Sequence, residues 1–440
     1  MKISYYSIGC KVNYAEISSI VQKFLDNGAE LVPFGEDCDL ILINSCTVTH
    51  LADSDSRKII RRAKRKAPNA KIAAMGCYAQ MQSEKIAEIE GVDYIFGNKE
   101  KFEIFDLIQN DLKNGFRTKN KDVQIFVSNL SNSPFYPAFS SDNESHSRIV
   151  FKIQDGCDYH CSYCTVAAAR GPSRSMNFDE IEKTIRNIEE KGYKEIVLSG
   201  INLGDYKSND GNRFIDLLKM IDATDFNTRF RISSIEPNLL TEEIIELVGN
   251  SKKFCPHFHI PLQSGSDRVL NKMRRRYSKS LFESRVELIK KHIPDCCIGV
   301  DIICGFPNES AEDFDETYSL LKMLPISYLH TFTYSERAGT DAIKLKPKVQ
   351  YEEKKRRTLT LRELSEIKKI EFYKSQLEKI KKVIPEEYDE ITSHCKGWTE
   401  NYVRVKFFCE KELESQVVSV KLDFLQGDLV FGKIANSSEY

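Results

Sequence analysis

Residues 149–164 read Ile-Val-Phe-Lys-Ile-Gln-Asp-Gly-Cys-Asp-Tyr-His-Cys-Ser-Tyr-Cys, an apolar run followed by three closely spaced cysteines. The apolar run has the length of a buried strand, and the cysteines occupy the loop after it. Cys157, Cys161 and Cys164 offer three thiolates to a cubic iron–sulfur cluster, in which each of the four irons needs a ligand. One iron is left open to a substrate or cosubstrate, so the triplet predicts a catalytic metal centre.

Five more strand-like segments follow this one at intervals of about 30 to 45 residues, and a helical pattern follows each of them. They are residues 195–198, 230–235, 258–262, 298–303 and 328–334. Six βα units of this size predict an α/β fold with a partial (βα)6 TIM-like barrel over residues 149–374. The cysteine triplet then lies on the face where barrel loops build active sites.

Polar residues and glycines at the ends of these strands are the candidate cofactor-binding residues. Glycines allow close backbone approach, and carboxylate or amide groups hold ribose hydroxyls or an ammonium group. Turn formation is an equally good explanation for each of them. The candidates are Ser199, Gly200, Ser233, Glu236, Gln263 and Asp301, together with Tyr163, which is placed to flank a bound purine. His257 and His259 alternate on one strand, and we expect hydrogen bonding rather than metal ligation from them.

Residues 1–110 form a separate pattern, in which strand-like runs at 3–8, 40–43 and 72–75 each end in a cysteine. Helical patterns lie between the runs, which predicts a doubly wound parallel sheet. Ligands bind beyond the carboxyl ends of such strands, so Cys10, Cys46 and Cys77 are expected to converge as a second three-thiolate site. The alternative, unrelated buried or surface thiols, is what we expect for Cys38, Cys255, Cys296, Cys297, Cys304, Cys395 and Cys409.

The polar residues 111–148 predict a linker. At the other end, short strand patterns within residues 375–440 predict a small β-barrel, a fold that often binds single-stranded or looped nucleic acid. Trp398, Tyr402 and Arg404 are its candidate RNA-binding residues, with barrel core as the alternative for the two aromatic residues.

A dense group of cations supports contact with phosphates. Residues 57–66 carry seven cations and no acid, whereas solubility alone favours mixed signs. Arg57, Arg61, Arg62 and Arg65 are the candidate RNA-binding residues of this helix. The net charge of −1 gives no global attraction to nucleic acid, so any binding must be local.

The composition indicates a protein of the cytoplasm. No apolar run approaches the ~18 residues that cross a bilayer, and the first residues do not have the shape of a signal peptide. Thirteen cysteines in such a chain of 440 residues favour metal or redox chemistry over a disulfide framework.

With these motifs placed, the sequence resembles the methylthiotransferases, a family of radical S-adenosylmethionine enzymes, over nearly its whole length. The matching stretches include residues 9–13, 44–49, 76–80, 157–164, 169–171, 231–237, 261–265, 305–307 and 334–335. Residues 397–402 are similar to the family's TRAM module, which binds RNA. The chain departs from the family at Val166-Ala167, which lacks a usual proline, at Asn308, and near Glu378, where glycines are usual.

The resemblance implies two [4Fe-4S] clusters with different tasks. The cluster on the triplet would bind S-adenosylmethionine and cleave it to a 5′-deoxyadenosyl radical, and the cluster on Cys10, Cys46 and Cys77 would present the sulfur. An electron donor and a sulfur source would be needed as partners. The start of the chain, residues 9–13, is most similar to the branch that acts on N6-threonylcarbamoyladenosine at position 37, in the anticodon loop of tRNA.

Three alternatives remain open at this stage. Sister branches act on N6-isopentenyladenosine in tRNA and on an aspartate of a ribosomal protein. From another class, a non-catalytic iron–sulfur RNA-binding protein is less consistent with three-ligand sites, because structural clusters usually have four ligands.

Overall fold

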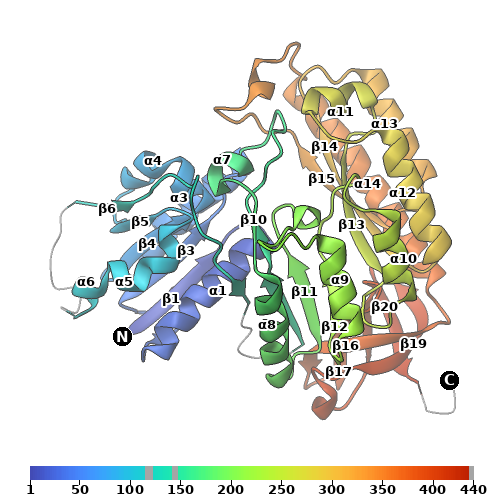
Figure 1. Cartoon of the computed structure of the whole chain (residues 1–440), viewed down its shortest axis with the longest axis horizontal. Coiled ribbons are helices and arrows are strands. Elements are labelled where there is room, and N and C mark those ends of the chain that lie inside the picture. Colours follow the sequence, from blue (N-terminus) through green and yellow to red (C-terminus); the bar gives the residue numbers. More distant parts are fainter. Residues whose placement is uncertain (114–121, 141–146, 436–440) are drawn as a thin grey trace.

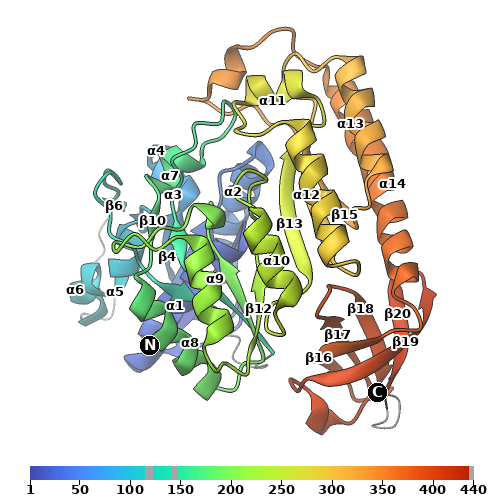
Figure 2. The same ribbon diagram turned by 45° about the vertical axis from the view of Figure 1, so that its right-hand side comes forward.

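The computed structural model describes residues 1–113, 122–140 and 147–435, which form two α/β parts and a C-terminal barrel (Figures 1 and 2). Among these residues, no helix combines the length and the apolar character needed to cross a bilayer.

The first part is a parallel sheet with helices on both faces (Figure 1). Its strand order is β2 (Glu30–Leu31), β1 (Lys2–Ser7), β3 (Leu40–Ser45), β4 (Lys71–Gly76), β5 (Tyr94–Phe96) and β6 (Gln124–Phe126). Alternate residues of β3 belong to different cores: Leu40 and Leu42 pack with helix α1 (Lys11–Asp26), and Ile41 and Ile43 with α2 (His50–Lys66). The prediction of a doubly wound parallel sheet is confirmed. The short helices α3 (Cys77–Met81), α4 (Ser83–Ala87), η1 (Glu100–Glu103), α5 (Ile104–Leu107) and α6 (Gln109–Lys113) complete this part.

Residues 111–148, expected to be a linker, contribute a strand to each neighbouring sheet. β6 pairs in parallel with β5, and the Phe126 ring stacks on Phe96 at a centroid distance of 5.1 Å. β7 (Ala138–Phe139) pairs antiparallel with the first barrel strand. Strands this short, in polar surroundings, give too few alternating positions to be recognised as strands. Residues 114–121 and 141–146 of this segment lie outside the described residues.

The middle part contains six parallel strands. They are β8 (Arg148–Lys152), β11 (Glu195–Ser199), β12 (Arg229–Ile232), β13 (His257–Gln263), β14 (Cys297–Cys304) and β15 (Tyr328–Thr333). Parallel bridges Phe230–Phe254 and Ser234–His259 join the two halves of this curved sheet. The partial six-stranded barrel is therefore confirmed. Its helices are α8 (Phe178–Glu190), η2 (Leu203–Asp205), α9 (Phe214–Ala223), α10 (Glu242–Asn250), α11 (Asp267–Met273), α12 (Lys279–His292), α13 (Ala311–Met323), η3 (Asp341–Lys344) and the long α14 (Tyr351–Ser375).

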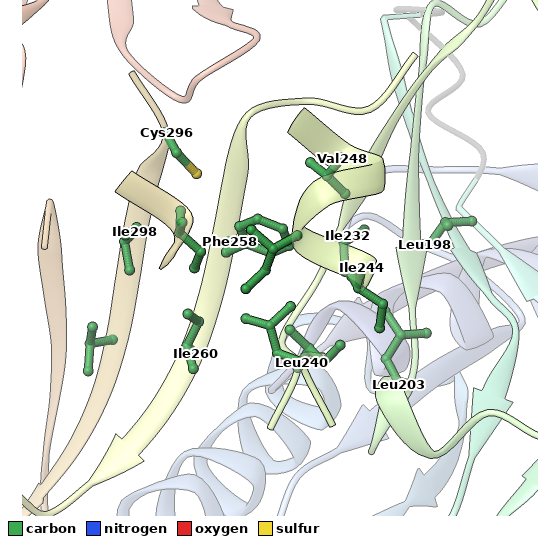
Figure 3. Packing of buried hydrophobic residues seen from close by; sticks show 14 of the residues in the cluster. Leu198, Leu203, Ile232, Leu240, Ile244, Val248, Phe258, Ile260, Cys296 and Ile298 are labelled. Carbon is green, nitrogen blue, oxygen red and sulfur yellow. The ribbon is translucent and has the colours of Figure 1, made fainter. Parts of the chain in front are cut away.

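The outer face of the barrel strands is apolar and the inner face is polar. Ile232, Phe258 and Ile260 pack against the helices, where they meet residues such as Ile244 and Val248 of α10 (Figure 3). The alternate residues of the same strands face the other way. They are mostly polar, whereas bulky branched residues dominate the interior of a complete TIM barrel. These inward positions include Arg148, Lys152, Glu195, Arg231, His257, His259, Asp301, Tyr328 and His330.

The C-terminal barrel is closed by β16 (Ile380–Asp389), β17 (His394–Thr399), β18 (Arg404–Phe408), β20 (Leu429–Ile434) and β19 (Val418–Gln426), with η4 (Lys411–Leu413) between β18 and β19. The small C-terminal β-barrel is confirmed. Cys395 and Cys409, for which we expected unrelated thiols, are buried in its core as a disulfide. Sequence alone does not give this pairing, because the two residues meet only when β17 and β18 are side by side.

Asn308 and Glu378, which stand where the family usually has glycine, adopt the left-handed backbone conformation that glycine adopts readily. Both residues have a φ of 66°. Asparagine tolerates this left-handed region better than other side chains, whereas glutamate adopts it at a cost in stability. The turn into the C-terminal barrel is therefore retained although its glycine is absent.

The C-terminal barrel is fixed to the amino ends of the middle strands. Arg229 donates to the carbonyls of Lys382 and Trp398, at 3.1 and 3.3 Å. Asp295 pairs with Lys379 and Lys381 at 2.6 and 2.9 Å. The opposite, carboxyl ends of the strands remain for the cysteine triplet.

Candidate metal centre and substrate-binding face

The cysteines of the first part follow β1, β3 and β4 at one edge of the sheet. Cys10 precedes α1, Cys46 follows β3, and Cys77 begins α3. Gly9 has a φ of 109°, and a Cβ atom there would lie 2.8 Å from the Cys46 Cβ and 3.0 Å from its sulfur. Glycine is needed at this position because the Cys46 side chain occupies the space of any side chain. Burial is the main cause that raises the pKa of the Cys46 thiol to about 12, and the nearby Cys77 and Cys10 thiols add to this rise.

The triplet Cys157, Cys161 and Cys164 lies between β9 (Gln154–Asp155) and α7 (Val166–Arg170); β9 pairs with β10 (Arg174–Ser175). Backbone N–H groups of Tyr159 and Val166 donate to the sulfurs of Cys157 and Cys164, at 3.4 and 3.3 Å. Burial raises the pKa of the Cys157 thiol to about 12 and that of Cys164 to about 11. Positive charge or a metal is therefore needed to keep them as thiolates.

One arginine side chain interacts with each set of three cysteines. Arg275 Nη1 donates to the Cys161 sulfur at 3.2 Å. Arg170 opposes the rise in the pKa of Cys10 that burial causes, and the Cys77 thiol in turn raises the pKa of Arg170. Three thiols on a positive background fit an iron–sulfur cluster, whose ligands are thiolates. Both sets therefore have the donor chemistry that two such clusters need.

The two sets lie on either side of one domain interface. Helix α3, which begins with Cys77, packs against α7, which follows the triplet (Figures 1 and 2). Asn98 Nδ2 connects them directly, since it lies 3.5 Å from the Cys77 sulfur and donates to the Ala169 carbonyl at 2.6 Å. Cys77 of the first set therefore lies close to α7, the helix that directly follows the second set.

A buried network of charges fixes this interface. Glu16 of α1 accepts from Lys101 at 2.6 Å, from Lys152 at 2.9 Å and from Arg170 at 3.0 Å. Arg170 also pairs with Asp155 at 2.9 Å. These cations hold the pKa of Glu16 and of Asp155 well below the usual range, although burial alone would raise it. Both carboxylates therefore remain ionised at the junction of the domains.

We expect Arg170→Met to lower the stability of the metal-free protein by about 3 kcal/mol, because it leaves buried carboxylate charge less compensated. The denaturant midpoint measures this loss. Arg186→Met is the matched control: its pair with Glu182 is on the surface, with side chains 50% and 40% exposed, and its loss is expected to cost below about 1 kcal/mol. Equal midpoints for the two variants would show that the network does not stabilise the interface.

Two predicted cofactor-binding residues, Ser233 and Glu236, follow the carboxyl end of the barrel strand β12. Ser233 Oγ has no hydrogen-bond partner among the described residues, and neither side-chain polar atom of Asn202, in the loop after β11, has one. Glu236 is paired with Arg275, and burial raises its pKa. Buried polar atoms without partners are costly, so their presence here fits a polar ligand such as S-adenosylmethionine. The sequence analysis did not select Asn202, because it lies three residues beyond Ser199, the last residue of β11.

The other predicted cofactor-binding residues have varied environments. Ser199 is buried at the end of β11, and a side chain at Gly200 would meet the Gln154 amide at 2.8 Å. Gln263 ends β13 with a φ of 66°. Tyr163 is half-buried beside the triplet, with its hydroxyl 3.4 Å from Arg275 Nη1. Of these four positions, Tyr163 shares Arg275 with Cys161 of the triplet.

Asp301 differs from the expectation. It lies inside β14 rather than at its end, and its carboxylate is 3.0 Å from His259 Nε2. Asp301 already lay within the predicted strand 298–303, and β14 is one residue longer at each end, with its pairing to β15 continuing to Cys304. Asp301 therefore belongs to the polar inner face. The hydrogen-bonding expectation for His257 is met by the Tyr328 hydroxyl at 3.1 Å.

The polar inner face is the main feature that we did not recognise in the sequence. Lys11, next to Cys10, interacts with it electrostatically: although the residue is exposed, the protein around its ammonium group reduces its hydration, and this together with the charges of Arg231 and Arg148 lowers the pKa of Lys11 to about 8. A signal was present, because strands such as 229–232 and 257–260 alternate polar and apolar residues. Strands buried on both faces normally read as continuous apolar runs.

The predicted RNA-binding residues fall into two groups. Arg61, Arg62 and Arg65 of α2 are exposed, and Arg57 donates to the Tyr78 hydroxyl at 2.9 Å beside a cavity of about 250 Å³. Thr47 and Thr165, which directly follow Cys46 and Cys164 in the chain, line this cavity. Its lining is completed by His50, Asp53, Met81, Gln82, Lys85, Arg337 and Ala338.

Tyr402 does not fit the role of an RNA-binding residue. Its ring lies 4.7 Å from His257, and Arg231 covers it at 5.1 Å, so it is packed between the two barrels. Trp398 stacks on Tyr402 at 4.4 Å, and Arg404 lies 5.1 Å from the Trp398 ring. The tight turn that carries Tyr402 directs it toward the middle barrel, which sequence alone does not show.

Comparisons with known proteins agree with this arrangement. A model described as the radical SAM superfamily matches residues 151–321, and one described as the uncharacterized protein family UPF0004 matches residues 2–97. The chain is 36% identical over 413 residues to the threonylcarbamoyladenosine tRNA methylthiotransferase MtaB of Aquifex aeolicus, covering 92% of this chain and 96% of that protein. It is 32% identical over 368 residues to the tRNA-2-methylthio-N(6)-dimethylallyladenosine synthase of Methylacidiphilum infernorum, covering 81% and 78%.

Among solved structures, the radical S-adenosylmethionine methyltransferase TsrM of Kitasatospora setae, with cobalamin and a [4Fe-4S] cluster bound, shares the fold. The TM-score is 0.55 at 14% identity, covering 76% of this chain and 74% of that chain. Cysteines, fold and near full-length relatives lead to one assignment. The chain belongs to the radical S-adenosylmethionine methylthiotransferase family.

Proposed function

We propose that the protein transfers a methylthio group to C2 of N6-threonylcarbamoyladenosine at position 37 of tRNA. The observation that supports this most is the meeting of two three-cysteine sets at one interface, in a chain similar over its length to a threonylcarbamoyladenosine tRNA methylthiotransferase. With S-adenosylmethionine, the bound clusters would supply radical generation and a sulfur donor. The chain's own residues hold and shield these groups.

Contacts across the interface support this division of labour. Arg337, in the loop after β15, pairs with Asp53 at 2.7 Å and donates to Thr47 Oγ1 at 2.6 Å, beside Cys46. The backbone N–H of His50 donates to Ser335 at 3.0 Å. These bonds hold the Cys46 loop against the barrel that carries the triplet. Reacting groups kept at a fixed separation, away from water, are what a radical reaction needs.

The tRNA anticodon loop would bind along the exposed face of α2. Arg61, Arg62 and Arg65 are exposed on it, and the cavity at Arg57 is also lined by Thr47 and Thr165, the residues that follow Cys46 and Cys164. A base in the anticodon loop is unpaired and is accessible to a protein without opening a duplex. We propose the cytoplasm as the site of action, with an electron donor and a sulfur source as further partners.

We expect neutralisation of Arg61, Arg62 and Arg65 to glutamine to weaken tRNA binding by about 10- to 100-fold. The slope of log Kd against log salt concentration should fall by about two to three, since each lost phosphate contact removes close to one unit. Fluorescence anisotropy with labelled tRNA measures both quantities. The control replaces Lys183, Arg186 and Lys191, exposed cations on or after α8, and should leave the slope unchanged. Equal slopes for both triple variants would exclude α2 from the tRNA interface.

Nucleoside mass spectrometry of tRNA from a deletion strain tests the function. The proposal predicts that N6-threonylcarbamoyladenosine accumulates without its 2-methylthio group and that the intact gene restores it. Loss of the methylthio group from N6-isopentenyladenosine instead would assign the substrate of the sister branch. Unchanged tRNA nucleosides would reject both and direct attention to a ribosomal-protein aspartate.

A further inference from the structure

The cavity at Arg57 combines positive charge with a neighbour of each cysteine set. Its volume is about 250 Å³, and its lining includes Thr47 and Thr165, which follow Cys46 and Cys164 in the chain. Pockets that enclose a whole drug-sized ligand have about 300–1,000 Å³. The cavity is therefore of a size for a substituent of a base rather than for a complete modified nucleoside.

The Arg57 guanidinium is held in place by an aromatic residue and not by an acid. Its Nη1 donates to the Tyr78 hydroxyl at 2.9 Å, and its central carbon lies 5.9 Å from the centre of the Tyr78 ring. Within the described part of the chain, no carboxylate pairs with Arg57 or with Lys85, which lines the same cavity. A guanidinium has five N–H donors, and the bond to Tyr78 uses one of them. Arg57 therefore keeps both its charge and donors for a ligand.

Asp53, the one carboxylate among the described residues that line the cavity, is already satisfied. It accepts from Arg337 Nη1 and Nη2 at 2.7 and 3.2 Å and from Thr47 Oγ1 at 2.8 Å. Asp53 thus neutralises Arg337 and leaves the charges of Arg57 and Lys85 uncompensated. Arg337 is 7% exposed, and its Nε has no hydrogen-bond partner among the described residues. Two uncompensated cations beside a buried unpaired donor fit an anionic ligand with further polar atoms.

The substrates in the names of the relatives differ in this respect. A threonylcarbamoyl substituent has a carboxylate that is ionised at neutral pH, together with a urea group and a hydroxyl, whereas a dimethylallyl substituent is a hydrocarbon. We propose that the cavity receives the threonylcarbamoyl substituent and that Arg57, with Lys85, binds its carboxylate and so selects this substrate. This inference rests on the proposed function, because it assumes that the modified base reaches the cysteine sets.

The test compares two anticodon stem-loops that differ in the charge of the substituent. One carries N6-threonylcarbamoyladenosine, and the other carries the same base with the neutral threoninamide. Arg57→Met keeps an unbranched side chain over Tyr78 and removes the charge and its donors. We expect it to lower kcat/KM about 30-fold for the carboxylate and less than about threefold for the amide, because a site built for a charged group discriminates against an analogue without it. Arg57→Lys should recover part of the loss, and Lys85→Met should show a smaller loss of the same kind.

Equilibrium binding gives a second readout that does not depend on turnover. With reconstituted protein and no reductant, the wild type should bind the carboxylate stem-loop more tightly than the amide, and this preference should disappear in Arg57→Met. Arg61→Met is the matched control on α2, because Arg61 is exposed and is not part of the cavity lining. Its loss should weaken both stem-loops by the same factor and leave the preference for the carboxylate unchanged.

The same measurements separate two other anions that would suit these cations. If Arg57 binds a tRNA phosphate, Arg57→Met should lose equally on both stem-loops. If Arg57 binds the carboxylate of S-adenosylmethionine, the variant should raise the KM for S-adenosylmethionine, again with equal losses on the stem-loops. Either result, or no loss on either stem-loop, would overturn the inference and leave the proposed function standing. A wild type that modifies neither stem-loop would reject the proposed function and the inference with it.

Discussion

Cys161→Ala is expected to abolish the cleavage of S-adenosylmethionine to 5′-deoxyadenosine. Cys161 is the central residue of the triplet, and Arg275 donates to its sulfur at 3.2 Å. Two thiolates cannot hold a cluster that needs three protein ligands and one open position. Anaerobic assay with dithionite, followed by chromatography of 5′-deoxyadenosine, should show product at background and iron reduced by about half.

The control for this prediction is Cys304→Ala. Cys304 is a buried thiol at the end of β14, and it belongs to the barrel core rather than to either cysteine set. This variant should keep its iron and cleave S-adenosylmethionine at close to the wild-type rate. Full cleavage by Cys161→Ala would show that the triplet does not hold the cofactor-binding cluster.

Cys46→Ala is expected to abolish methylthiolation of tRNA while leaving the cleavage of S-adenosylmethionine largely intact. The triplet is intact, so 5′-deoxyadenosine formation should stay within about threefold of the wild type. Methylthiolated product should fall to background, because Cys10 and Cys77 alone leave the second cluster without its third ligand. Mass spectrometry of the tRNA product and chromatography of 5′-deoxyadenosine, on one reaction mixture, measure both.

Cys38→Ala serves as the matched variant in the same domain. Cys38 is buried against β3 but is not part of the convergent set, and burial and two neighbouring aspartates raise its pKa to about 11. It should retain both activities. If Cys46→Ala instead kept full product yield, the assignment of a second cluster to Cys10, Cys46 and Cys77 would be wrong.

The predicted strands and the two cysteine sets depended on local patterns, which is why the sequence revealed them. Each barrel strand carries apolar residues toward its helices, and each cysteine of the first set directly follows a strand or its turn. The contacts that join the sets depend on residues far apart in the chain. Glu16 and Arg170 are separated by 154 residues and Glu16 and Lys101 by 85, so no local pattern connects them.

Side-chain direction explains the remaining differences. Tyr402 has a φ of 66°, and this turn directs its ring toward the middle barrel rather than to solvent. Asp301 lies within β14, as it lay within the predicted strand 298–303, and its carboxylate is on the polar inner face beside His259. The polar inner face was visible as an alternation in residues 229–232, but its meaning depends on the neighbouring strands that curve around the same space.

Iron content of anaerobically reconstituted protein tests the central claim most directly. Two sets of three cysteines at one interface predict about eight irons and about eight labile sulfides per chain in the wild type, and about four of each in either cysteine variant. A wild-type protein that never exceeded about four irons per chain would contradict the account.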